Sequence, residues 1–201
     1  MTPSEHQDPA AAKARLRETA RQARAAAVAA DSGDAPSRVA VHLLARYGDI
    51  ATDGVVSGYL AIGDELDVAP ALTSFRTAGW RTALPVVVAP ATPLVFRQWQ
   101  PGAPLEAGPL KTRHPSPQAA ETAPDILLVP LLAFDGAGYR IGWGGGFYDR
   151  TLAALRQGKR VHAVGVGYAA QRVDAIPRDR HDARLDAIIT EAGLMEVSET
   201  S

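Results

Sequence analysis

Short apolar segments alternate with segments of helical periodicity along this chain, and this alternation restricts the possible folds more than any other feature. The apolar segments are nearly continuous, as strands covered on both faces would be. We expect such strands at 55–62, 84–88, 125–129, 161–167 and 186–190. We expect helices at 9–30, around 39–44 with an end near Gly48, at 68–78 and at 148–155. This order predicts an α/β fold with a mainly parallel sheet between two helix layers.

The length of 201 residues favours a single α/β domain that spans the whole chain, 1–201. Residues 94–99 alternate more in polarity, and we expect them to pair antiparallel with a neighbouring strand. The segment 101–124 is rich in proline and polar residues, which predicts a long surface loop. We expect the tail after about residue 195 to be frayed.

Composition excludes several classes of protein. The 21 Lys and Arg residues are balanced by 22 Asp and Glu residues, so no net positive field exists to bind nucleic acid or an anionic membrane. The absence of cysteine excludes disulfides, thiolate nucleophiles and cysteine-bound zinc. The start of the chain is polar, and prolines interrupt its most apolar region. We therefore expect a cytoplasmic monomer that acts on small molecules.

A glycine-dense loop between an expected strand and an expected helix carries the strongest functional signal, within VPLLAFDGAGYRIGWGGGFYDRTL at 129–152. Glycines permit positive φ and close approach of the backbone to a ligand, and the helix beginning near Phe147 presents its N-terminal amides. Arg140 precedes the loop and can stabilise phosphoryl oxygens, while Asp149 can hold magnesium. A bare glycine cluster of this kind is about as often a tight turn with a helix-capping Asp as a phosphate site.

The string AFDGAGYRIGWGGGFYDR closely resembles the signature of the 5-formyltetrahydrofolate cyclo-ligase family, also called methenyltetrahydrofolate synthetases. The resemblance extends to Lys13-x-x-x-Arg17, to Asp64-Glu65 after the first strand and to the final HDARLDAIITE at 181–191. It implies a Rossmann-like three-layer α/β/α sandwich. It also implies conversion of 5-formyltetrahydrofolate to 5,10-methenyltetrahydrofolate with ATP and Mg²⁺, releasing ADP and phosphate, without a redox cofactor.

The resemblance also assigns roles to residues of this sequence. It places Arg140 and Tyr148 in catalysis and Asp149 and Asp182 at magnesium. ATP would be bound by Lys13, Arg17, Arg140, Gly142, Gly144, Gly145, Gly146, Phe147 and Tyr148. The folate would be bound by Leu60, Glu65, Trp143, Gly144, Gly145, Gly146 and Phe147, with the Glu65 carboxylate accepting the N–H donors of the pterin.

Each of these roles has a structural alternative. The basic residues of the first helix recur every four residues and would also suit a solvated ridge. Glu65 would favour the dipole of the following helix if it stood in its first turn. Of the aromatic pair Phe147 and Tyr148, we expect one ring to face the core. Asp182 or Asp186 would alternatively cap the last element.

The sequence departs from the family's pattern at two positions. Members commonly have a glutamate in the long loop where this chain has Ser116, within His-Pro-Ser-Pro, and some have a lysine where it has Gly145. These differences leave open two alternatives. One is a related enzyme or phosphotransferase acting on a different metabolite, and the other is a non-catalytic domain that senses a phosphorylated ligand.

Overall fold

The computed structural model describes residues 9–50, 53–109 and 112–197. The helices are α1 (Pro9–Ala30), α2 (Ala35–Tyr47), α3 (Ala69–Thr77) and α4 (Phe147–Gly158), with a 3₁₀ turn η2 (Ala169–Gln171). The central sheet contains β1 (Val55–Ser57), β2 (Arg81–Val86), β3 (Val95–Gln98), β6 (Ile126–Pro130), β9 (His162–Val166), β10 (Ala187–Thr190) and β11 (Gly193–Glu196). Two short hairpins are formed by β4 (Glu106–Ala107) with β5 (Arg113–His114) and by β7 (Ala133–Phe134) with β8 (Arg140–Ile141).

The seven-stranded sheet has the order β11-β10-β9-β6-β1-β2-β3. Strands β2, β1, β6, β9 and β10 are parallel, whereas the edge strands β3 and β11 are antiparallel to their neighbours. The chain winds first from β1 to β2 and then returns to β6 on the other side of β1. The direction of winding therefore reverses between β1 and β6, and in doubly wound sheets ligands bind at such a point, beyond the carboxyl ends of the strands.

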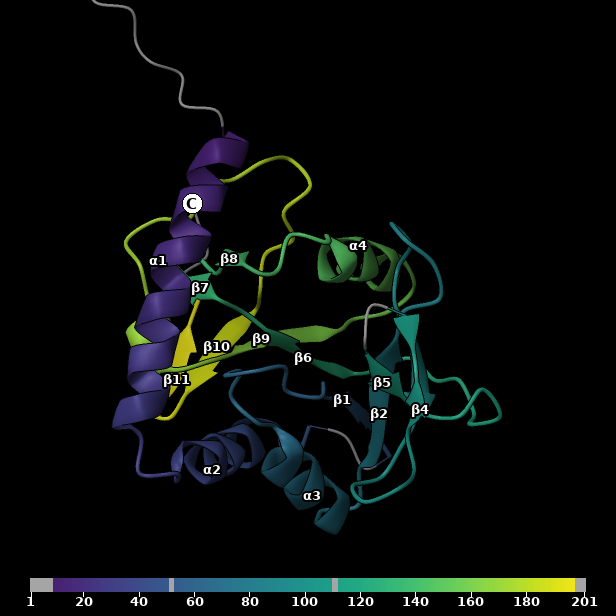
Figure 1. Ribbon diagram of the computed structural model, residues 1–201. Helices are drawn as coiled ribbons and strands as arrows, with labels where there is room; N and C mark the ends of the chain where they lie inside the picture. The colour runs from purple at the N-terminus through teal and green to yellow at the C-terminus, as the bar shows by residue number, and fades with distance from the viewer. Residues whose placement is uncertain (1–8, 51–52, 110–111, 198–201) are drawn as a thin grey trace, which may run out of the picture.

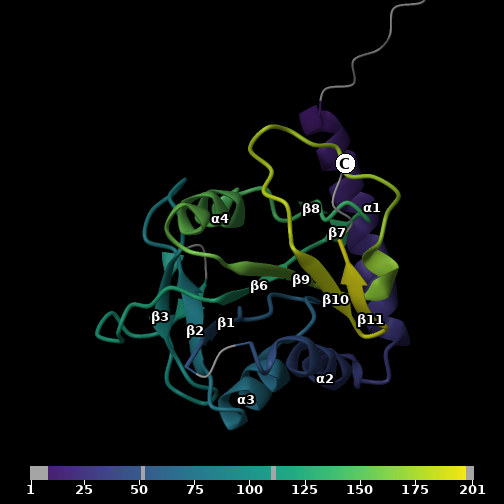
Figure 2. The same ribbon diagram turned by 180° about the vertical axis from the view of Figure 1, so that it is seen from behind.

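Helices cover both faces of the sheet, so the expected three-layer α/β/α architecture is confirmed. Helices α2 and α3 lie on one face and α4 on the other (Figures 1 and 2). Neighbouring residues of β6 point to opposite faces: Leu128 is buried with the α2 and α3 side chains, while Leu127 is buried with Leu152 of α4. This double burial explains why the strands read as continuous apolar segments.

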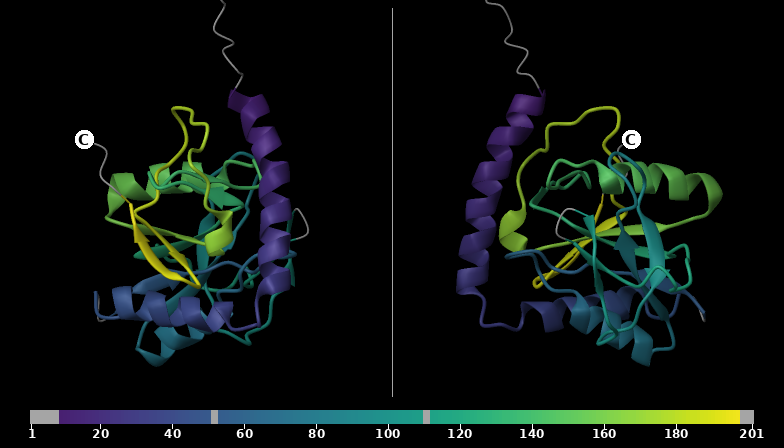
Figure 3. Two further views of the ribbon diagram at one scale, coloured as in Figure 1. Left: turned by 90° about the vertical axis from the view of Figure 1, so that its left-hand side faces the viewer. Right: turned by 45° about the vertical axis from the view of Figure 1, so that its right-hand side comes forward.

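Helix α1 stands along one side of the molecule rather than in either layer (Figure 3). Its alanine-rich side packs through Leu16 and Ala20 against a small apolar cluster that includes Leu132 and Ile141. This contact turns the basic side of α1 toward the loop that follows β8. None of the helices in the described part of the chain is long and apolar enough to cross a membrane.

The first strand is shorter than expected, because β1 ends at Ser57 instead of continuing to residue 62. The Gly58 amide still donates to the Ala83 carbonyl oxygen at 3.1 Å, but the chain then leaves the sheet. Gly58 lies so close to the side chain of Leu72 that an added Cβ would approach it to 2.7 Å. The Tyr59 hydroxyl is fixed on the Leu66 carbonyl oxygen at 2.7 Å. After Ser57, Gly58 and Tyr59 are therefore buried outside the sheet, while Ala61 and Ile62 are exposed.

Other boundaries also differ from expectation. Strand β2 spans 81–86 instead of 84–88, because its first residue, Arg81, pairs with Val55 of β1. The proline-rich segment 101–124 contains the β4–β5 hairpin, so it is not all loop. Fraying after residue 195 is wrong for Glu196, which pairs with Ala187 in the β10–β11 ladder. Residues 1–8 and 198–201 lie outside the described residues, so the expectations for the polar start and the last residues stay predictions.

Candidate active site

A cleft of about 1370 Å³ opens beyond the carboxyl ends of the parallel strands. Tyr59 and Leu60 reach it directly after β1, and Pro130 reaches it at the end of β6, so it lies where the winding reverses. Its volume exceeds the range of about 300–1,000 Å³ that is common for sites of one drug-sized ligand. All residues assigned roles from the sequence line it, namely Lys13, Arg17, Leu60, Glu65, Arg140, Gly142, Trp143, Gly144, Gly145, Gly146, Phe147, Tyr148, Asp149 and Asp182.

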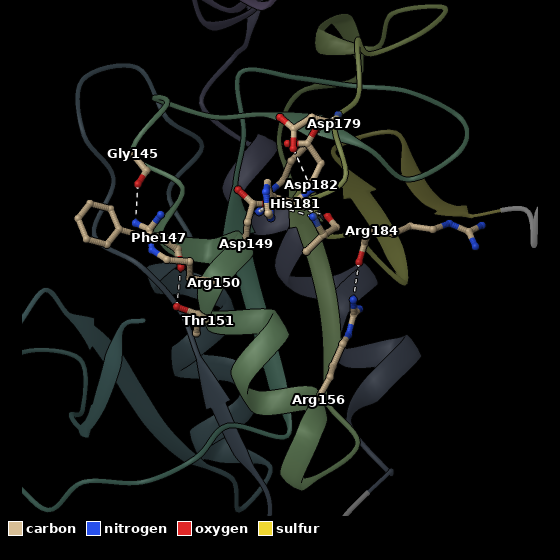
Figure 4. Close-up of polar contacts among 12 residues, drawn as sticks. Gly145, Phe147, Asp149, Arg150, Thr151, Arg156, Asp179, His181, Asp182 and Arg184 are labelled. Carbon is tan, nitrogen blue, oxygen red and sulfur yellow. Dashed lines mark hydrogen bonds and ion pairs between the residues drawn. The ribbon is translucent and has the colours of Figure 1, made fainter. Parts of the chain in front are cut away.

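The glycine-dense loop at 142–146 leads directly into α4. Gly144 and Gly146 adopt φ values of +95° and +64°, which side chains with a Cβ rarely tolerate. Gly146 is the N-cap of α4 and has no side chain to cap the first amides. The positive end of the α4 dipole therefore faces the cleft with backbone N–H groups available to an anion. The Arg150 guanidinium holds the loop from the other side by donating to the Gly145 carbonyl oxygen at 2.6 Å (Figure 4).

Two basic residues of α1 reach this end of the cleft. Lys13 Nζ lies 2.8 Å from an Asp179 carboxylate oxygen and 2.6 Å from one of Asp182. Burial alone would lower the pKa of Lys13, but the two carboxylates outweigh it and the pKa is raised. Arg17 Nε donates to the Gly142 carbonyl oxygen at 3.1 Å. The face of α1 that carries Lys13 and Arg17 therefore contacts residues of the cleft and is not a solvated ridge.

Arg140 joins α4 to the segment that follows η2. Its Nη2 donates to Asp149 Oδ1 at 2.8 Å and its Nη1 donates to the Ala183 carbonyl oxygen at 2.7 Å. The Ala183 amide in turn donates to Asp149 Oδ1 at 3.1 Å. The Arg140 side chain is only 6% exposed. This closed set of bonds places Asp149 beside the residue that follows Asp182, and Figure 4 shows the two carboxylates and His181 gathered above the start of α4.

Asp149 and Asp182, the two carboxylates expected at magnesium, both line the cleft. The described residues contain no group of three or more His, Asp or Glu side chains that could hold a metal ion. Magnesium needs only one or two protein carboxylates, because it retains water and takes further oxygens from phosphates. Each carboxylate is paired with a cation in this structure, Asp149 with Arg140 and Asp182 with Lys13. A bound metal would therefore replace or share these partners.

Glu65 also lines the cleft, where its side chain contacts Trp143 of the glycine-dense loop. Its carboxylate is buried, with one oxygen 2.9 Å from the Ile62 amide and the other 2.7 Å from the Trp143 indole nitrogen. Burial raises the pKa of Glu65, and these two hydrogen bonds offset only part of the effect. Burial likewise raises the pKa of the Tyr148 hydroxyl, with a further contribution from the Glu65 charge. Tyr148 is therefore a neutral hydrogen-bond donor at physiological pH.

The aromatic pair at the start of α4 does not divide as expected. Phe147 and Tyr148 both line the cleft, and both also pack against the buried cluster on the α4 face of the sheet. The assigned residues thus bring basic side chains, the glycine loop and the Glu65 carboxylate into one cleft. Ser116 does not line this cleft, so the departure from the family pattern at that position lies away from it.

Sequence reasoning missed two charged residues that organise the site. Asp179 shares Lys13 with Asp182, and the hydrogen bond from Lys13 lowers the pKa of Asp179. Arg24 is almost completely buried and forms an ion pair with Asp64. The signal for Arg24 was present, because the basic residues at 17, 21 and 24 follow one face of α1. Nothing local marks Asp179, since its partner is 166 residues away.

These features define the class of protein. A doubly wound α/β sheet carries, at its reversal point, a cleft that is lined by an uncapped helix N-terminus, a glycine loop, basic side chains and a buried carboxylate. Such a cleft suits an enzyme that holds an anionic, phosphate-bearing ligand next to a second ligand with N–H donors.

The chain belongs to the 5-formyltetrahydrofolate cyclo-ligase family, whose model matches residues 9–191, so the resemblance expected from the sequence is confirmed. The 5-formyltetrahydrofolate cyclo-ligase of Escherichia coli K12 is 34% identical over 155 residues, which cover 75% of this chain and 85% of that protein. Membership of this family makes the chain a ligase.

Solved structures show the same fold. The 5,10-methenyltetrahydrofolate synthetase of Aquifex aeolicus superposes with a TM-score of 0.69 at 23% identity, over 94% of both chains. The 5,10-methenyltetrahydrofolate synthetase of Mycoplasma pneumoniae gives a TM-score of 0.68 at 22% identity, over 89% of this chain and 98% of that one. The Rossmann-like single-domain architecture is therefore shared with these proteins.

Proposed function

We propose that this protein converts 5-formyltetrahydrofolate to 5,10-methenyltetrahydrofolate in an ATP- and Mg²⁺-dependent reaction that releases ADP and phosphate. The observation that carries the proposal is that one cleft brings the glycine loop and the basic side chains near the start of α4 together with the buried carboxylate of Glu65. Family membership supports the same reaction. The cleft volume of about 1370 Å³ supports binding of both substrates at once.

The chemistry divides into two steps. The formyl oxygen attacks the γ-phosphorus of ATP, the bond to the bridging oxygen breaks, and ADP leaves. N10 of the folate then adds to the activated carbon and loses its proton, and the carbon–oxygen bond breaks to release phosphate and close the ring. Both steps depend on aligning two bound reactants and on neutralising charge at the transferred phosphoryl group.

The glycine loop and the basic residues that line the cleft would bind the nucleotide. The amides of the glycine loop and of the first turn of α4 would receive the phosphates, with Lys13, Arg17 and Arg140 as charge partners. Asp149 and Asp182 would hold Mg²⁺, which would supply neutralisation of the phosphoryl oxygens when bound. Arg140 would keep Asp149 in place through the bonds that it makes to Asp149 and Ala183.

Glu65 and the apolar and aromatic residues that line the cleft would bind the folate. The Glu65 carboxylate would accept the N–H donors of the pterin, and Leu60 would contribute apolar contact. Phe147 and Trp143 would stack against its ring system. Tyr148, which stays protonated, would donate a hydrogen bond to an oxygen that gains charge during the reaction.

Mixing the purified protein with 5-formyltetrahydrofolate and Mg-ATP tests the proposal. We expect the near-ultraviolet chromophore of the methenyl product to appear, with one ADP formed per product, and to fail to appear when the metal is removed by a chelator. Folate binding without turnover would indicate a sensor. ADP formation from ATP that depends on another phosphoryl acceptor would indicate a related enzyme with a different substrate.

We also propose that the protein acts as a cytoplasmic monomer. Its lack of cysteine supports a reducing compartment and leaves no residue that could link two chains by a disulfide. Light scattering coupled to size-exclusion chromatography should return the mass of one chain, and a larger mass would contradict it.

A further inference from the structure

Trp143 combines two properties that rarely occur together. The residue is 51% exposed, yet its indole N–H is donated to the buried carboxylate of Glu65 at 2.7 Å. Large exposed aromatic residues usually leave their polar atom to water, and core tryptophans usually bury their ring. Trp143 therefore makes its contact with Glu65 without contributing to the core.

Helix α1 holds Trp143 in this position. Arg17 binds the carbonyl oxygen of the preceding residue, Gly142, at 3.1 Å. The guanidinium carbons of Arg21 and Arg24 lie 5.7 and 5.6 Å from the centre of the indole ring, within the range of cation–π contacts. The arginines on this face of α1 thus keep the glycine loop closed toward Glu65.

The two oxygens of Glu65 have different partners. Oε2 accepts from the backbone amide of Ile62, which belongs to the same turn and cannot leave without unfolding it. Oε1 accepts from Trp143, a side chain on a glycine-rich loop with half of its surface in solvent. Of the two hydrogen bonds, the one from Trp143 can therefore be broken with the smaller change in structure.

We propose that Trp143 is a built-in surrogate for the pterin, which occupies Glu65 in the free protein and must give way when a ligand with its own N–H donors binds. The inference rests on the proposed function, because it takes Glu65 as the pterin-binding carboxylate. Trp143 then lowers the affinity for every ligand that binds at Glu65, and it discriminates against those ligands that have no N–H donors. Such ligands leave the carboxylate without a partner when they displace the indole.

Calorimetric titration with 5-formyltetrahydrofolate, without ATP, tests this role. Trp143→Phe keeps an aromatic ring on the loop but removes the competing N–H, so the Kd for folate should fall at least about tenfold, the equivalent of one hydrogen bond to a charged group. Trp99→Phe is the matched control: its indole N–H is donated to the Ala103 carbonyl oxygen at 3.1 Å, outside the cleft, and its Kd should equal that of the wild type.

A second measurement follows the indole itself. In ¹⁵N-labelled protein, the indole signal of Trp143 is identified by its loss in the Phe variant, and it should shift when 5-formyltetrahydrofolate is added. An unchanged or higher Kd for Trp143→Phe, or an indole signal that ligand leaves in place, overturns the inference alone. If the wild type binds no 5-formyltetrahydrofolate, the proposed function itself is wrong.

Discussion

Arg140 is the residue at which charge and geometry can be separated most clearly. Its guanidinium makes two bonds at once, to Asp149 at 2.8 Å and to the Ala183 carbonyl oxygen at 2.7 Å. Arg140→Lys keeps the positive charge, but a single ammonium cannot reproduce the planar fork that reaches both partners. Arg140→Ala removes the charge and both bonds.

The contacts of Arg140 determine how large the loss of stability and of turnover should be in each variant. Loss of one charge-assisted bond in Arg140→Lys should lower the free energy of unfolding by about 1.5–3 kcal/mol. Arg140→Ala should cost about 3 kcal/mol, the low end for a broken buried pair, because Asp149 is 27% exposed and keeps the Ala183 amide. If Arg140 also stabilises the transferred phosphoryl group, turnover should fall about 100-fold in the alanine variant, equivalent to about 2.7 kcal/mol.

Both quantities can be measured on the same preparations, by urea unfolding and by formation of the methenyl chromophore. Arg38→Ala on the exposed side of α2 is the control, because this arginine does not line the cleft and should leave turnover unchanged. Full turnover in Arg140→Ala would remove Arg140 from the mechanism. Full turnover in Arg140→Lys with a large loss in the alanine variant would show that charge matters and the fork does not.

Three further predictions concern the loop, the charged pair and the buried carboxylate. Gly144 has a φ of +95°, so Gly144→Ala should lower the free energy of unfolding by about 1–3 kcal/mol and weaken ATP binding. Gly142 has neither a positive φ nor a neighbour within 4 Å of an added Cβ, so Gly142→Ala should change stability less. Thermal unfolding of the two variants compares these effects. Asp179 has a lowered pKa and Lys13 a raised one, so their contribution to stability should be lost as the pH falls below 3.8 or rises above 10.5, and unfolding of Asp179→Asn should lack the acid-side loss. Glu65 has a raised pKa, so its contribution to the free energy of unfolding is present below pH 4.5 and is lost as the pH rises above that value. Glu65→Gln should therefore gain stability relative to the wild type between pH 4 and 7 while losing folate affinity. Identical curves of stability against pH for the two proteins would contradict this.

The pattern of residues along the chain was sufficient for the layered fold and for the position of the glycine loop that lines the cleft. Continuous apolar strands indicate burial on both faces, and this burial requires helices on both sides of the sheet. The glycine loop could be recognised because its conformation depends on its own residues, with Gly144 and Gly146 adopting positive φ and α4 beginning immediately after. A feature that depends on a few neighbouring residues can therefore be predicted from those residues alone.

The tertiary structure alone decided where strands stop and which charges meet. The strand expected at 55–62 ends at Ser57, because packing against α3 draws the next residues away from the sheet. The β4–β5 and β7–β8 ladders pair two residues each, too few for a periodic signal. Lys13 meets Asp179, and Trp143 meets Glu65, across 166 and 78 residues. Such pairings depend on how the whole chain packs, so no single segment of sequence contains them.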